Sequence, residues 1–135
     1  MNTFKLNIVI PDGEKFSGEA ASITVKTTEG DVQILAGHAD YLAAVGTGRA
    51  RLVTADGTEK LASASGGFIS VSEGEVSLVT TTFEFADQIN IDRARKAKEK
   101  AENALSSNSD KASEALLKAK LARAMNRINV WELNK

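Results

Sequence analysis

Four cationic side chains in the last third of the chain have the types and the spacing to bind phosphate. Arg93 and Lys100 are seven residues apart, and Arg123 and Arg127 are four apart, so each pair shares one face of a helix. A guanidinium group donates two parallel hydrogen bonds to phosphate oxygens, and an ammonium group adds a point charge. If two helices bring these pairs together, the four cations rim one end of a groove that suits a polyphosphate.

The same cations can also be interpreted as a solvated helix surface, in which Glu114 would pair with Lys118 four residues later. Charge is divided along the chain. Residues 1–86 carry six basic and eleven acidic side chains, and residues 87–135 carry eleven basic and seven acidic ones. The basic part therefore favours an acidic partner, a phosphate ligand or a nucleic acid. A nucleic-acid-binding module is the less favoured alternative, because Glu99 and Glu102 interrupt the basic residues.

No other motif indicates catalysis. His38 is the only histidine, and no nucleophile or metal ligand lies at a recognised spacing from it, so we interpret it as a structural or contact residue of a loop. The chain has no cysteine, and zinc would have to use His38 and carboxylates. The glycines of 46–48 and 66–67 are predicted to form β-turns, because neither pair is followed by the Gly-Lys-Ser/Thr of a phosphate loop. An enzyme acting on a nucleotide is thus the third and least supported alternative.

A pair of helices must position the cations. Asn90 can cap the first helix, which continues to about Leu105, and Ser109 or Asp110 can cap a second helix that ends near Trp131. Alanines recur at helical spacing on both, and the second helix also has a stripe of larger apolar residues. We expect the alanine stripes to form the seam of a helical hairpin, and the larger stripe to require a further surface. The stripes are Ala94, Ala97, Ala101 and Ala104; Ala112, Ala115, Ala119 and Ala122; and Leu117, Leu121, Ala124, Ile128 and Trp131.

The N-terminal part has the pattern of short β-strands. Phe4, Leu6, Ile8 and Ile10 alternate with other residues, and all ten glycines fall before residue 75, many of them in turn motifs such as that of residues 11–13. Such spacing predicts an antiparallel β-sandwich or barrel over residues 1–86, followed by the helical hairpin over residues 87–135. No apolar run is long enough for a membrane span, and no signal peptide pattern begins the chain, so we expect a cytosolic protein.

With its strands followed by a helical hairpin, the sequence resembles the epsilon subunit family of F-type ATP synthases over its whole length. The resemblance depends on motifs that are individually weak and specific only together. They are Pro11-Asp12-Gly13, Gly30-Asp31, Ile34-Leu35, Gly37-His38-Ala39, Ser65-Gly66-Gly67, Ile89-Asn90-Ile91-Asp92-Arg93-Ala94, Ala97-Lys98-Glu99-Lys100-Ala101-Glu102 and Arg123-Ala124-Met125-Asn126-Arg127.

The resemblance implies a sandwich of about ten strands in a non-catalytic rotor subunit of the central stalk. Such a subunit binds the gamma subunit and the loops of the c-ring, and it couples ion-driven rotation to ATP synthesis at the cytoplasmic face of the cell inner membrane. The family's ring-facing loop matches Asp31 and His38. The hairpin is expected either to fold on the sandwich or to extend along gamma into the alpha/beta catalytic head, where it inhibits ATP hydrolysis.

Several bacterial members of the family bind ATP on the folded hairpin, and the resemblance transfers that site to eight residues here. They are Glu84, Ile89, Asn90, Arg93, Ala94, Lys100, Arg123 and Arg127. Asn90 replaces an aspartate of the motif and Lys100 replaces an arginine, so we expect ATP to be a weak regulatory ligand and no cofactor to be required. Asp40 and Tyr41 replace a usual Pro-Leu beside His38, which alters the expected ring contact.

Overall fold

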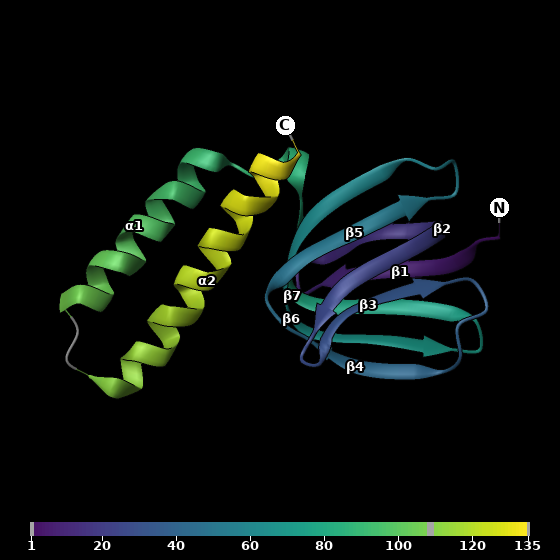
Figure 1. The fold of residues 1–135 in the computed structure, drawn as a ribbon, viewed down its shortest axis with the longest axis horizontal. Helices are drawn as coiled ribbons and strands as arrows, with labels where there is room; N and C mark the ends of the chain where they lie inside the picture. Colours follow the sequence, from purple (N-terminus) through teal and green to yellow (C-terminus); the bar gives the residue numbers. More distant parts are fainter. Residues whose placement is uncertain (1, 108–109, 135) are drawn as a thin grey trace.

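The protein is described by a computed structural model that covers residues 2–107 and 110–134. Seven strands are followed by a short 3-10 helix and two α-helices (Figure 1). The helices form an antiparallel hairpin beside the strands, with α2 lying between α1 and the sandwich. The bounds are β1 (Phe4–Ile10), β2 (Gly13–Thr27), β3 (Gly30–Leu35), β4 (Tyr41–Val45), β5 (Gly48–Thr54), β6 (Glu59–Ser72), β7 (Glu75–Phe85), η1 (Ala86–Gln88), α1 (Ile91–Ser107) and α2 (Lys111–Leu133).

The strands form a sheet that folds back on itself around an aliphatic core. The strand order is β1-β7-β6-β4-β2-β3, while β5 bridges β2 and β6, and β1 also pairs with β2. Phe4, Leu6 and Ile8 of β1 are all buried, as their period of two predicts. Ile23 of β2 and Ile69 of β6 are fully buried in the same core. The predicted β-sandwich followed by a helical hairpin is therefore confirmed. The sandwich is not wholly antiparallel as predicted, because β1 pairs with β7 in parallel.

The strands are longer than the short pieces that the glycines suggested, and the described residues contain seven of them rather than about ten. The β-turn predicted at Gly66 and Gly67 is wrong, because β6 continues through both glycines in unchanged register against β7. A Cβ on Gly67 would lie 1.9 Å from the carbonyl oxygen of Val79, so glycine permits a close approach of two backbones here. Gly46, in contrast, lies in the short connection from β4 to β5.

Both helices begin at the caps expected from the sequence. The Oδ1 atom of Asn90 accepts a hydrogen bond of 3.1 Å from the backbone N–H of Arg93 at the start of α1. Asp110 caps α2 in the same way, accepting from the N–H of Ala112 at 3.0 Å. These bonds satisfy donors that the first helical turn leaves free. The alternative cap, Ser109, lies outside the described residues.

The seam between the helices differs from the predicted one. Ala94 and Ala101 of α1 are buried, as expected, whereas Ala97 is exposed and Ala104 is only half-buried. On α2, however, the four predicted alanines at 112, 115, 119 and 122 are all exposed, while Leu117 and Ile128 are half-buried. Leu117 and Ile128 bury more apolar area against α1 than the alanine methyl groups would. This difference explains why α2 is turned about its own axis relative to the predicted seam. Neither helix, over its described residues, combines the length and apolarity needed to cross a membrane.

Candidate functional site

Asn126 of α2 makes two hydrogen bonds that hold the hairpin on the sandwich. Its Nδ2 atom donates to the carbonyl oxygen of Gly48 at 2.8 Å and to Oγ of Ser63 at 2.9 Å. Ser63 is buried, and the nearby hydroxyls of Thr47 and Ser65 lie 3.0 Å apart. The strand surface beneath α2 is thus partly polar, so its contact with the helix depends on specific hydrogen bonds as well as on apolar burial.

A small apolar cluster completes this contact near the C-terminal end of α2. Ala86, Ile89 and Val130 are buried together, with Leu61 and Trp131 packed against them. This cluster is separate from the sandwich core, which has 18 buried members. Because so few apolar side chains join the hairpin to the sandwich, we expect the hairpin to open at much lower cost than the sandwich unfolds.

An ion pair adds a third contact between hairpin and sandwich. The Nε atom of Arg127 in α2 lies 3.1 Å from Oε1 of Glu84 in β7, and both side chains are about one-third exposed. Among the described residues, Oε1 of Glu84 is buried and has no hydrogen-bond partner. Arg127 therefore supplies the charge that compensates this carboxylate, although partial exposure keeps the contribution near that of a surface pair.

The residues predicted to bind ATP line two neighbouring hollows. The hinge hollow, of about 380 Å³, lies where β7 leads into α1. The seam hollow, of about 270 Å³, lies between α1 and α2. Ala97 and Arg127 line both, so the two hollows adjoin. The hinge hollow is lined by Glu84, Gln88, Asn90, Arg93, Ala94, Ala97 and Arg127, and the seam hollow by Ala97, Lys100, Ala101, Ala104, Leu117, Lys120, Arg123 and Arg127.

Seven of the eight predicted ATP residues line these hollows, and the eighth, Ile89, does not. Ile89 is 7% exposed and packs with Ala86 and Val130, so its role in the structure is to anchor the hinge. Gln88 and Lys120 line the hollows but were not among the predicted residues. Lys120 is three residues before Arg123, a helical spacing that could have revealed it.

The four cations Arg93, Lys100, Arg123 and Arg127 therefore gather along one groove of the folded hairpin, which comprises the two hollows together. Arginine forks and ammonium groups in such a groove can bind phosphate oxygens, and the alanines leave room for a flat, apolar group between the helices. Glu114 and Lys118 pair at 2.8 Å as predicted, but they do not line either hollow.

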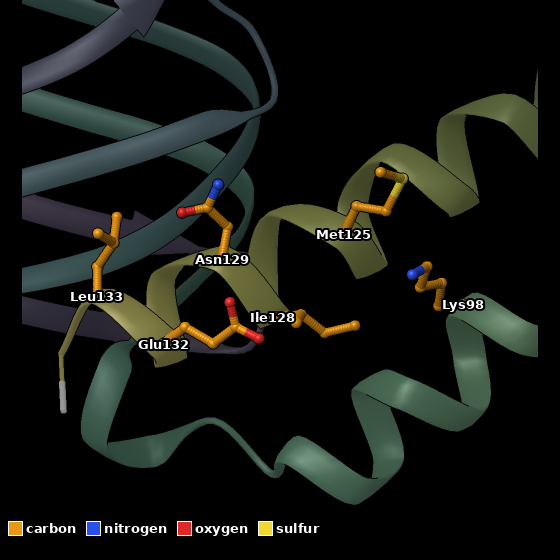
Figure 2. Close-up of a pocket in the computed structure, with 6 residues that line it drawn as sticks. All are labelled: Lys98, Met125, Ile128, Asn129, Glu132 and Leu133. Carbon is orange, nitrogen blue, oxygen red and sulfur yellow. The ribbon is translucent and has the colours of Figure 1, made fainter.

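A third hollow lies at the C-terminal end of α2 (Figure 2). It measures about 380 Å³, and Lys98 of α1 and Ile128 of α2 are among its lining residues. Met125 and Leu133, also in the lining, are each 50% exposed. This surface is more apolar than the groove, and none of the residues predicted to bind ATP belongs to it.

Asp31 and His38, predicted together as a ring contact, lie toward opposite ends of the same strand. Asp31 is the second residue of β3, whereas His38 lies three residues after that strand ends. At about 3.3 Å per residue, the strand from Asp31 to Leu35 alone spans roughly 13 Å. The His38 ring packs edge-on against Tyr41 at 5.6 Å between centroids, and Oδ1 of Asp40 accepts a hydrogen bond from the Glu73 N–H at 3.1 Å. Asp40 thus ties its loop to the β6–β7 turn.

Comparison with known proteins agrees with this architecture. The beta-sandwich domain model of the ATP synthase delta/epsilon chain matches residues 3–86, and the long alpha-helix domain model of the same chain matches residues 87–132. The ATP synthase epsilon chain of Staphylococcus aureus strain JH9 is 37% identical over 134 residues, covering 98% of this chain and 99% of that one. The epsilon chain of strain MW2 has the same identity and coverage.

Solved structures show the same fold. A chain in the Euglena gracilis mitochondrial ATP synthase, in a structure of OSCP, F1 and the c-ring, aligns with a TM-score of 0.79 and 25% identity over 92% of this chain and 78% of that one. A chain in the central stalk and c-ring of the Tetrahymena thermophila mitochondrial ATP synthase aligns with a TM-score of 0.62 and 12% identity, covering 94% and 95%. With both domain models matched in order and the epsilon relatives covered almost end to end, the chain belongs to the ATP synthase delta/epsilon chain family.

Proposed function

We propose that this chain works in the central stalk as a rotor subunit whose C-terminal hairpin restrains ATP hydrolysis. As an epsilon subunit it is a stalk component and not the catalytic subunit. In the proposed role, residues 1–86 bind the gamma subunit and the c-ring loops, and they carry rotation from the ring to the catalytic head. Residues 87–135 regulate, and the assembled subunit lies peripherally at the cytoplasmic face of the cell inner membrane.

The observation that carries the regulatory part is the limited contact between hairpin and sandwich. Among the described residues, this contact includes the Asn126 hydrogen bonds, the Arg127–Glu84 ion pair and the small cluster around Val130. A contact of this size suits an element that leaves its docking surface and binds elsewhere, because each interaction can be replaced by water or by another protein. The exposed Leu116 and Met125 of α2 provide apolar surface for the alternative position along gamma and in the alpha/beta head.

An apolar area on the sandwich supports the proposed gamma contact. Leu42 of β4 is 71% exposed and Phe68 of β6 is 44% exposed. These strands are neighbours, with Ala44 directly opposite Phe68. Large apolar side chains that gather on neighbouring strands mark protein contact sites more often than isolated ones do. Tyr41 begins β4, and the ring of His38 from the preceding loop packs against it, so we assign this end of the sandwich to the stalk contact.

We further propose that ATP is a weak ligand of the hairpin groove. Arg93, Arg123 and Arg127 line it and retain phosphate-directed donors. Asn90 lacks the carboxylate of the family motif, and its side chain is already occupied in capping α1. Lys100 supplies charge without a bidentate fork. Both departures lower affinity, so docking contacts rather than ATP set the position of the hairpin.

Cross-linking tests the regulatory role directly, because the chain has no native cysteine. Asn126→Cys combined with Ser63→Cys, joined by a short bifunctional maleimide, should hold the hairpin on the sandwich. An ATP synthase reconstituted with this locked subunit should hydrolyse ATP as fast as one containing residues 1–86 alone, and both should exceed the enzyme with the unmodified chain. The two single-cysteine variants, treated with the same reagent, are the controls. Equal hydrolysis by the locked, truncated and unmodified complexes would refute regulation by the hairpin.

A further inference from the structure

A cationic hollow distinct from the hairpin groove lies where α2 crosses the sandwich. It measures about 550 Å³, and its lining includes Lys26, Arg49 and Arg51 from the strands and Asn126 and Asn129 from α2. One acidic residue, Asp31, also lines it. We call it the junction hollow. Because its walls come from both parts of the chain, it has this form only while the hairpin is docked.

Lys26 is directed into this region by a glycine. Its register partner on β3 is Asp31, and a lysine and an aspartate at directly opposed positions would be expected to form an ion pair across the strands. No ion pair joins them among the described residues, and the Lys26 side chain instead passes over Gly48. A Cβ on Gly48 would lie 2.7 Å from Cβ and 2.8 Å from Cδ of Lys26, so any larger residue would displace this side chain. The stem of the Lys26 side chain therefore runs beside Gly48, whose carbonyl oxygen accepts the Asn126 hydrogen bond.

The two arginines of the hollow differ in their availability. Arg51 binds Glu59 through two contacts of 2.8 Å, Nε to Oε1 and Nη2 to Oε2, so its fork is already occupied. Arg49 has no ion pair among the described residues, and it lies on β5 next to Gly48. Two positive charges, those of Lys26 and Arg49, therefore lack a counter-charge within ion-pair distance in the described part of the chain, while a single carboxylate shares the hollow.

We propose that the junction hollow binds a small phosphate-type oxyanion, held by Lys26 and Arg49 from the sandwich and by the Asn129 amide from α2. A compact tetrahedral anion can accept hydrogen bonds from donors on several sides, which matches donors contributed by both walls. An acidic segment of a partner is less favoured, since a single planar carboxylate uses fewer of these directions. Because the site requires both walls, the anion stabilises the docked hairpin by mass action.

Titration of the full-length chain with inorganic phosphate, followed by calorimetry at constant ionic strength, tests this assignment. Saturable binding is expected, and Lys26→Met and Arg49→Met should each weaken it about fivefold or more, a loss expected for one charged donor. Lys5→Met removes the same charge from an exposed strand position remote in sequence and should leave binding unchanged. Lys96→Met, at an exposed position of α1 that lines neither the junction hollow nor the hairpin groove, should also leave it unchanged.

A second measurement follows the hairpin. Trp131 is the only tryptophan and lies in the docking cluster, so its fluorescence reports the docked state. Phosphate should protect the amides of α2 from hydrogen exchange in the unmodified chain and much less in Lys26→Met. Without phosphate, the two proteins should have the same Trp131 emission, because the substitution does not itself release the hairpin. The proposal would be overturned if Lys5→Met weakened phosphate binding as much as Lys26→Met does, or if only Arg93→Met, in the hairpin groove, abolished it. It would also be overturned if acetate bound as tightly as phosphate, or if no saturable binding were found.

Discussion

Asn126 and Gly48, 78 residues apart in the sequence, are joined by a hydrogen bond of 2.8 Å between the side-chain amide of α2 and the first carbonyl group of β5. The same amide also donates to Ser63 of β6, so one side chain ties the helix to two adjacent strands. Neither acceptor has a charge, which makes the contact insensitive to salt. It can therefore fix the register of the hairpin on the sandwich without preventing its release.

Replacing that amide should free the hairpin. Asn126→Leu keeps the side-chain size but leaves the Gly48 carbonyl and the buried Ser63 hydroxyl without a donor, which costs about 1–3 kcal/mol of docking free energy. We expect faster hydrogen exchange in α2 and a shift of Trp131 emission to longer wavelength, with the exchange of the sandwich core unchanged. Asn103→Leu, at an exposed position of α1, is the control. Unchanged exchange in α2 would mean that the apolar cluster alone holds the hairpin.

Restoring the motif residues at the two groove positions that depart from the ATP-binding motif should increase the affinity for ATP. Asn90→Asp restores a carboxylate at the hinge hollow and keeps the cap, while Lys100→Arg restores a fork in the seam hollow. Together they should tighten ATP binding by about tenfold or more, at roughly 1.4 kcal/mol for each tenfold step. Equilibrium titration of the isolated chain measures this, with the exposed Lys96→Arg as control. Tight ATP binding by the unmodified chain, or no change in the double variant, would contradict the assignment.

Two glycines of the sandwich, Gly67 and Gly46, should respond very differently to replacement by alanine. At Gly67 the added Cβ would lie 1.9 Å from the Val79 carbonyl oxygen, and the φ angle of +145° is unfavourable for any side chain. We expect Gly67→Ala to lower the free energy of unfolding by about 2–5 kcal/mol, through backbone strain and displacement of β7. At Gly46 a Cβ would meet no other atom within 4 Å, so Gly46→Ala should be nearly neutral. Urea denaturation distinguishes the two.

The turn between β5 and β6 should make the free energy of unfolding fall in acid. The side chain of Asp56 accepts hydrogen bonds from the Thr54 hydroxyl and from the Thr58 N–H, and these lower its pKa to about 2 from an ordinary value of 3.8. A carboxyl whose pKa is depressed by folding stabilises the protein above the unfolded value, and this contribution is lost as the pH falls from about 4 to about 2. Asp56→Asn should therefore flatten the pH dependence of unfolding in that window. An unchanged pH dependence in Asp56→Asn would contradict this assignment.

Local patterns in the sequence were sufficient for the elements themselves. The alternation of Phe4, Leu6 and Ile8 identified β1, and Asn90 and Asp110 marked the first turns of α1 and α2. Each of these signals depends on neighbours within a few residues, through side-chain period or capping, so no distant contact was needed to interpret it. Helical spacing alone likewise put Arg93 with Lys100, and Arg123 with Arg127, on one face of each helix, without any information on how the two helices pack.

Tertiary packing decided how those elements face one another. Helix α2 has two apolar stripes, and the competition for buried area against α1 selected Leu117 and Ile128 over the alanines. That rotation placed Asn126 on the sandwich, where its partners Gly48 and Ser63 come from distant strands. The separation of Asp31 from His38 has a similar cause, because β3 is extended between them. Such choices depend on contacts between residues far apart in sequence, whose energies no local pattern records.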